Sequence, residues 1–221
     1  MKTKKTRWVS LVFVLIAVAA GVWLYPKVAA QVPTHWNLQG QVNGWMPRFW
    51  AVAMWPLLIA ALALLTWLLP VISPRKFEIK PFVGIYNIVM LVVQAFVLVL
   101  GVSVLLAAAG HALDVPLVAT LATAVLLMVL GNYLGKLRKN FFIGIRTPWT
   151  LASDAVWERT HRFAGVLYMA VGVLVVICVL AHGPRWLPIA LILIATASAV
   201  IYSYVIYRRL ERRHPQAGEK P

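Results

Sequence analysis

The sequence predicts an all-α membrane protein that is built as a bundle of six transmembrane helices. Hydrophobic residues make up 62% of its 221 residues and charged residues only 12%, whereas soluble proteins contain about 25% charged residues. The mean hydropathy is +0.83. Apolar residues concentrate in six runs, and each run approaches or exceeds the roughly 20 residues that cross a hydrocarbon core. These runs cover residues 8–25, 49–72, 82–110, 116–135, 163–182 and 187–207.

None of the six runs has an acidic or basic residue near its middle. Ion pumps place ionisable side chains within the membrane, so this pattern argues against a pump with buried carboxylates. Passive transport also lacks the expected sign, a broken or charged central helix. Cys178 lies in the fifth run and, as the single cysteine, cannot form an internal disulfide.

The basic residues predict the orientation of the bundle, with both termini in the cytoplasm. Basic residues close to membrane helices mark the cytoplasmic side. If the amino terminus is inside, 18 of the 21 lysines and arginines fall on inner segments, and Lys27, Arg48 and Arg185 remain outside. The inner face should therefore attract anionic lipid headgroups. We expect no nucleic acid partner, because the sequence contains no recognition fold or base-stacking surface.

A second interpretation concerns the first run. The basic start, the apolar stretch and the small residues near Ala30 also resemble a secretory signal that is cleaved after Ala30. The later helices would keep their orientation in either case.

The longest outer segment, residues 26–48, should form a compact folded loop. Asn43-Gly44 is a pair that favours tight turns with positive φ, and Gly40 supplies a second break. His35 and Asn37 offer hydrogen bonds. The loop is either a structured cap on the bundle or a surface that meets an external ligand.

The inner segment 140–161 should begin as a loop and continue as an amphipathic helix. The residue before a proline avoids helical geometry, which predicts a loop up to Thr147-Pro148. From Trp149 to Phe163, apolar residues recur every three or four positions. Such a helix would lie along the headgroups, or against the bundle, before turning into the fifth span.

The polar face of this helix allows two interpretations. Asp154, Glu158 and His161 follow a helical spacing that could place them around a divalent metal, although such sites need a further ligand from another helix. Alternatively, the face is solvated and carries a Glu158–Arg162 pair. We expect no metal and no other cofactor.

Arg146 is the most informative residue of the loop, because its guanidinium can clamp a phosphate, a carboxylate or several carbonyls. It either anchors the loop or receives a lipid headgroup or a peptide. Upstream, Gly131 and Gly135 permit close helix approach, and Asn132 could donate a hydrogen bond across that contact. The expected partners of Arg146 are Asn140, Thr147, Trp149, Thr150 and Trp157.

Two stretches carry a family resemblance. "GNYLGKLRKNFFIGIRTPWTLASDAVWERTHRFAG" resembles the signature of the SdpI family of bacterial membrane proteins. "PTHWNLQGQVNGW" resembles the small domain of unknown function that often precedes it, with Asn43 where an aspartate is expected. The resemblance implies a multi-pass protein of the bacterial cytoplasmic membrane, whose founding member protects its producer from a toxic peptide and holds a repressor at the membrane.

The resemblance also implies a set of contact residues and a division of the chain. Residues 1–81 would form an amino-terminal two-helix unit, and residues 82–221 a four-helix unit with the inner motif at 136–162 and a basic tail. The implied partners are a peptide toxin and a cytoplasmic regulator. The candidate contact residues are Asn140, Arg146, Thr147, Trp149, Thr150, Trp157 and His161.

The leading hypothesis is therefore an immunity or signalling membrane protein. The alternative is an enzyme that acts on a lipid or peptide at the inner leaflet, with His161 and Glu158 as acid and base. The sequence contains no zinc-protease, nucleophile-elbow or phosphate-loop motif that would support this alternative.

Overall fold

The computed structural model describes residues 3–213 and confirms the six-helix bundle. Each of the six long helices is apolar and long enough to cross a membrane. They are α1 (Thr3–Leu24), α2 (Arg48–Ile72), α3 (Val83–Ala108), α4 (Val115–Leu134), α6 (Asp154–Leu180) and α7 (Leu187–Arg213). Lys2 and residues 214–221 of the predicted basic tail lie outside the described residues.

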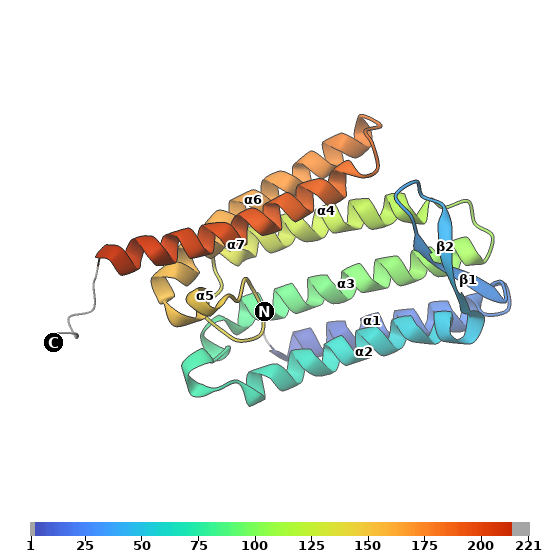
Figure 1. Ribbon diagram of the computed structural model, residues 1–221. Helices are drawn as coiled ribbons and strands as arrows, with labels where there is room; N and C mark the ends of the chain where they lie inside the picture. Colours follow the sequence, from blue (N-terminus) through green and yellow to red (C-terminus); the bar gives the residue numbers. More distant parts are fainter. Residues whose placement is uncertain (1–2, 214–221) are drawn as a thin grey trace.

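The helices pack in two groups of three (Figure 1). Ala17, Ile59 and Val97 form a core that joins α1, α2 and α3. A second core joins α4, α6 and α7 through Ala124, Val175 and neighbouring residues. α3 thus packs with α1 and α2, although the predicted division of the chain separates it from them. The division of the chain into residues 1–81 and 82–221 stays a prediction.

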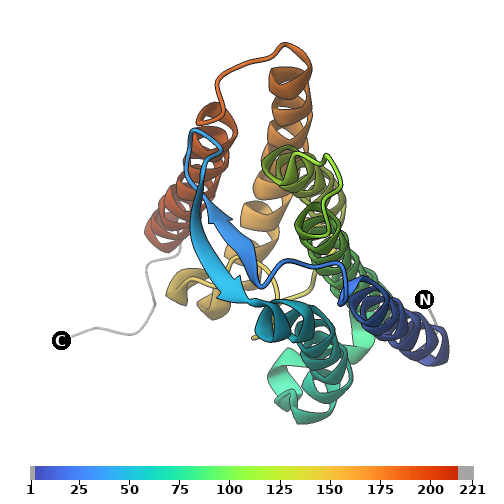
Figure 2. The ribbon, with the colours of Figure 1, turned by 90° about the vertical axis from the view of Figure 1, so that its right-hand side faces the viewer.

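Short elements connect the helices at two opposite ends of the bundle. The hairpin end carries β1 (Gln31–Trp36) and β2 (Val42–Pro47). The motif end carries η1 (Arg75–Phe77), η2 (Lys80–Phe82) and α5 (Pro148–Ala152). In Figure 2 the hairpin extends from the start of α2 across the end of the bundle toward α7.

α4 and α6 cross at glycines. A Cβ atom at Gly131 would lie 2.7 Å from the carbonyl oxygen of Gly165, and one at Gly165 would lie equally close to the Gly131 oxygen. The two backbones are therefore in direct contact, as expected from small residues at membrane helix crossings. The predicted hydrogen bond from Asn132 is wrong, because this side chain is exposed.

The predicted outer segment folds as a two-stranded antiparallel hairpin, but its turn differs from the predicted one. Asn43 and Gly44 lie inside β2, where Gly44 pairs with His35. The chain reverses at Gly40, which has a φ of +80°. The Asn37 side chain stabilises this turn by accepting hydrogen bonds from the backbone N–H groups of Gln39 and Gln41, at 3.1 and 2.8 Å.

The inner helix also differs from the prediction. α5 ends at Ala152, and α6 starts at Asp154 after the Ser153 hydroxyl caps it by accepting from the Val156 N–H. α6 then continues to Leu180 without the expected turn into the span. The sequence between these positions contains no proline or second cap that would end the helix.

Candidate functional site

The motif end is organised by Asn140, which is fully buried. Its amide nitrogen donates to the carbonyl oxygens of Arg138 and Ile143, at 2.9 and 3.1 Å. Its amide oxygen accepts from the backbone N–H groups of Phe142 and Ile143, both at 2.8 Å. All four hydrogen-bonding positions are used, so Asn140 holds the loop in one shape.

His161 fixes the next part of the loop from α6. The Ile145 N–H donates to its Nε2 at 2.9 Å. Nε2 must therefore be unprotonated, and Nδ1 carries the hydrogen that it donates to the Trp157 carbonyl at 2.8 Å. Gly144 makes this approach possible: it has a φ of +106°, and a Cβ atom there would lie 2.4 Å from Nε2.

Trp157 completes the same cluster. Its indole N–H donates to the Leu137 carbonyl at 2.8 Å, and its ring stacks on His161 with 4.0 Å between centroids. Trp157 also packs against Tyr86 and Met90 of α3. It therefore joins the motif end of α6 to the first group of helices.

Thr147 and Thr150 form a reciprocal cap at the start of α5. The Thr150 hydroxyl accepts from the Thr147 N–H at 2.9 Å, and the Thr147 hydroxyl accepts from the Thr150 N–H at 3.3 Å. The indole N–H of Trp149 donates to the hydroxyl of buried Ser203 in α7, and its ring meets Tyr204 edge to face. These contacts dock α5 on α7.

Arg146 remains exposed. Its guanidinium donates to the Phe141 carbonyl, which agrees with the anchoring interpretation. Since a guanidinium has five donor positions, others stay open to solvent. Arg146 is the one charged residue among the predicted contact residues, and its guanidinium is both held in place and accessible. A binding role for Arg146 and for the other six residues stays a prediction.

The predicted polar face of α6 is wrong at His161, which is fully buried between the helices. Asp154 pairs instead with Lys139 at 2.7 Å, and Glu158 with Arg162 at 2.6 Å. The three side chains do not converge, and residues 3–213 contain no group of three His, Cys, Asp or Glu side chains that could hold a metal. Because both ring nitrogens of His161 are engaged within the fold, the geometry gives no support to an acid–base pair with Glu158.

A cavity of about 970 Å³ lies beside this cluster at the motif end. Glu78, Asp154 and Glu158, half of the acidic residues in the sequence, line it together with Lys136, Arg138 and Lys139. The cavity is therefore lined by three acidic and three basic side chains, whose formal charges cancel.

A second cavity, of about 620 Å³, opens at the hairpin end between the two groups of helices. The hairpin, α2, α3, α4, α6 and α7 all contribute to its walls. It is lined by residues 34–38 of the hairpin and reaches down to Leu100, eight residues before the end of α3. At 1.5 Å per residue the cavity extends roughly 12 Å below the end of that helix.

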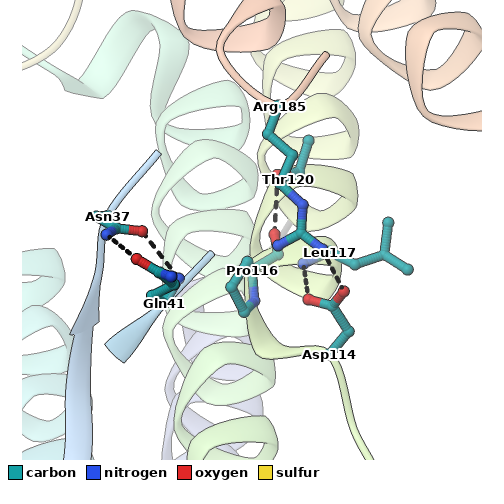
Figure 3. Close-up of polar contacts among 7 residues, drawn as sticks. All are labelled: Asn37, Gln41, Asp114, Pro116, Leu117, Thr120 and Arg185. Atoms are coloured by element: carbon teal, nitrogen blue, oxygen red, sulfur yellow. Dashed lines mark hydrogen bonds and ion pairs between the residues drawn. The ribbon is translucent and has the colours of Figure 1, made fainter. Parts of the chain in front are cut away.

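An ion pair stands at the rim of this hairpin cavity (Figure 3). The Arg185 guanidinium lies 3.2 Å from the Asp114 carboxylate. The same carboxylate caps α4 by accepting from the Leu117 N–H at 3.0 Å. Arg185 also meets the tip of the hairpin, because a Cβ atom at Gly40 would lie 1.8 Å from its Nη1.

The predicted outer residues lie on this rim. The Asn37 side chain bonds the Gln41 amide at 3.0 Å, also shown in Figure 3, and His35 bonds Asn43 across the hairpin. Both line the cavity. Sequence reasoning missed Asp114, although an aspartate two residues before a proline is a typical helix-start signal. Arg185 was used in the sequence analysis only to predict the membrane orientation, and not as a site residue.

The sequence comparisons agree with this architecture. Residues 136–203 match the model of the SdpI/YfhL protein family, and residues 12–60 match a domain of unknown function, DUF1648. Over 208 residues the chain is 24% identical to the Immunity protein SdpI of Bacillus subtilis (strain 168). The alignment covers 93% of this chain and 98% of that protein. No solved structure matches the chain. The family match across the motif end and this nearly full-length relative show that the chain is similar to proteins of the SdpI/YfhL family, and its six long apolar helices identify it as a multi-pass protein of the cell membrane.

Proposed function

We propose that this protein is an immunity protein that protects a cell from a membrane-active peptide. The observation that carries the proposal is the similarity to the Immunity protein SdpI along 93% of the chain. That alignment spans the hairpin end as well as the motif end, so it is not confined to one shared domain. Six membrane-crossing helices with exposed apolar faces fit a protein that meets such a peptide within the bilayer.

The proposed orientation places the motif end in the cytoplasm and the hairpin end outside. The hairpin end carries Lys27, Arg48 and Arg185, whereas the other basic residues of the described chain belong to the motif end. This asymmetry follows the rule for cytoplasmic loops.

The finer part of the proposal is that the motif end binds a cytoplasmic regulator or anionic lipid headgroups. Exposed lysines and arginines surround the rigid loop that Asn140 and His161 hold. Arg146 offers a fixed, accessible guanidinium in their midst, and such a group recognises carboxylates and phosphates. These features support a docking surface whose shape is set before binding.

The test is expression of the protein in a bacterium that a panel of purified membrane-active peptides kills. Cells that carry the protein should survive at least one peptide that kills cells with an empty vector. Arg146→Ala should lower this survival if the motif end takes part. Arg159→Ala is the matched control, because it removes an exposed charge of the same kind from the same end.

Two results would oppose the proposal. Unchanged killing by every peptide, with the protein present in the membrane, contradicts protection itself. Equal survival with Arg146→Ala and with the unaltered protein contradicts a role for the motif end.

A further inference from the structure

The hairpin cavity combines features that match a peptide better than a lipid chain. Five consecutive residues, 34–38, line it along one side. They belong to β1 and to the start of the turn. The extended part of this stretch, residues 34–36 of β1, therefore borders the cavity.

β1 has a free edge. The sheet contains two strands, so within the described chain β1 pairs with β2 on one side only. The backbone N–H and C=O groups along the other edge of such a strand are available to a further strand. Proteins use edges of this kind to bind extended peptides, with affinity from main-chain hydrogen bonds and selectivity from pockets for alternate side chains.

The remaining walls suit apolar side chains. They come from both groups of helices, and a volume of about 620 Å³ lies within the range of roughly 300–1,000 Å³ typical of ligand pockets. Apolar wall residues include Met54, Trp55, Leu100, Val104, Val179 and Ile189.

The ion pair at the rim does not seal the cavity. Asp114 and Arg185 neutralise each other and are 42% and 54% exposed. Exposed ion pairs contribute little to stability, typically about 0–1 kcal/mol, so this pair can open at little cost. Asp114 is tied to the start of α4, which leaves the Arg185 side chain as the part that moves.

We propose that the hairpin cavity binds a peptide segment with apolar side chains, which adds in extended form to the free edge of β1 and places alternate side chains between the two groups of helices. This inference deepens the proposed function, on which it rests for the class of ligand. A lipid chain could fill the walls but would leave the strand edge unpaired.

The test is photo-crosslinking of the full chain in phospholipid nanodiscs. The probe is acetyl-Leu-Val-Leu-Val-Leu-amide with photo-leucine at its central position. Labelling should map to residues 34–38 and to the facing walls. A second probe carries the same side chains with every backbone nitrogen of residues 2–5 methylated, which removes the donors that a new strand needs. It should label at least tenfold less.

Variants that fill the cavity give an independent readout. Ala119→Phe and Val179→Phe place a ring on cavity walls that belong to different helices, α4 and α6. Each should reduce labelling at least fivefold. Val125→Phe is the matched control, because Val125 lies on α4 with 52% of its surface exposed. This variant should be labelled as strongly as the unaltered protein. The methylated probe tests the unaltered chain, so it remains decisive if a variant fails to fold.

The outcomes separate this inference from the proposed function. Equal labelling by the two probes, or labelling that is insensitive to both filling variants, overturns the binding site. If Ala119→Phe and Val179→Phe abolish labelling while expressing cells still survive the peptides, protection stands and this site is wrong. If the probe binds as expected and no peptide is resisted, the site stands and the immunity function fails.

Discussion

The crossing of α4 and α6 is a contact that a single added methyl group should disturb. We predict that Gly131→Ala and Gly165→Ala each destabilise the protein, because an added Cβ atom meets backbone atoms of the opposite helix. At Gly131 the nearest atoms are the Gly165 carbonyl oxygen at 2.7 Å and the Met169 nitrogen at 2.8 Å. Backbone cannot rotate away as a flexible side chain can, so the helices themselves have to separate.

The size of the effect follows from the geometry. Ordinary contact of a Cβ atom begins near 3.4 Å, which requires the two helices to move apart by about 0.7 Å at this point. Overpacking of this kind costs about 1–3 kcal/mol, and the better helix propensity of alanine returns up to about 1 kcal/mol. A net loss of about 1–2 kcal/mol in the free energy of unfolding lowers the folded-to-unfolded ratio about 5- to 30-fold.

Equilibrium unfolding in mixed micelles with increasing fractions of SDS measures this loss through helix content. Gly135→Ala, at the C-cap of the same helix, is the control, because its Cβ atom would sit 3.5 Å from the Arg162 side chain, in ordinary contact. The reasoning is refuted if Gly131→Ala unfolds at the same SDS fraction as Gly135→Ala.

Three further predictions concern the loop and the orientation. Asn140→Asp replaces the amide group that donates to two carbonyl oxygens with a carboxylate oxygen that cannot donate. Each buried group left unsatisfied costs about 1–3 kcal/mol, so the substitution should lower the melting temperature. An unchanged melting temperature contradicts this. Gly144→Ala should displace the His161 ring, so the imidazole nitrogen resonances in NMR spectra should lose the pattern of a single Nδ1–H tautomer. Gln39→Cys should react with an impermeant reagent outside intact cells and Asp154→Cys only after permeabilisation; the reverse result inverts the proposed topology.

Much of the fold could be predicted because membrane helices obey a length rule. All six predicted runs correspond to helices, since hydrocarbon requires about 20 apolar residues and internal backbone hydrogen bonds. The amino-terminal end of α6 was less predictable. Its apolar periodicity was visible, but only tertiary contacts decide that it continues straight into the span with His161 facing inward.

The turn of the hairpin shows how two local signals compete. Asn43-Gly44 is a strong short-range turn signal, yet the chain turns at Gly40. The Asn37 side chain bonds two backbone N–H groups across that turn and stabilises it there. A sequence shows both signals without their energies, so it could not select between them.

The hairpin cavity was beyond the sequence for a different reason. Its walls come from α2, α3, α4, α6, α7 and the hairpin, and no local pattern reports how these elements are placed together. Asp114 and Arg185 are 71 residues apart in the chain. Their pairing depends on the close approach of the start of α4 to the loop before α7.

The two ends of the bundle join the helix groups through different contacts. At the motif end, buried Trp157 and Leu137 pack against Tyr86 and Met90 of α3, which gives an apolar joint. At the hairpin end, buried Val115 of α4 packs with Val104 and Leu105 of α3, and the exposed Arg185 side chain meets the hairpin tip at Gly40. Because the backbones of α4 and α6 are in direct contact, we expect a ligand that widens the hairpin cavity to move these two helices as one unit.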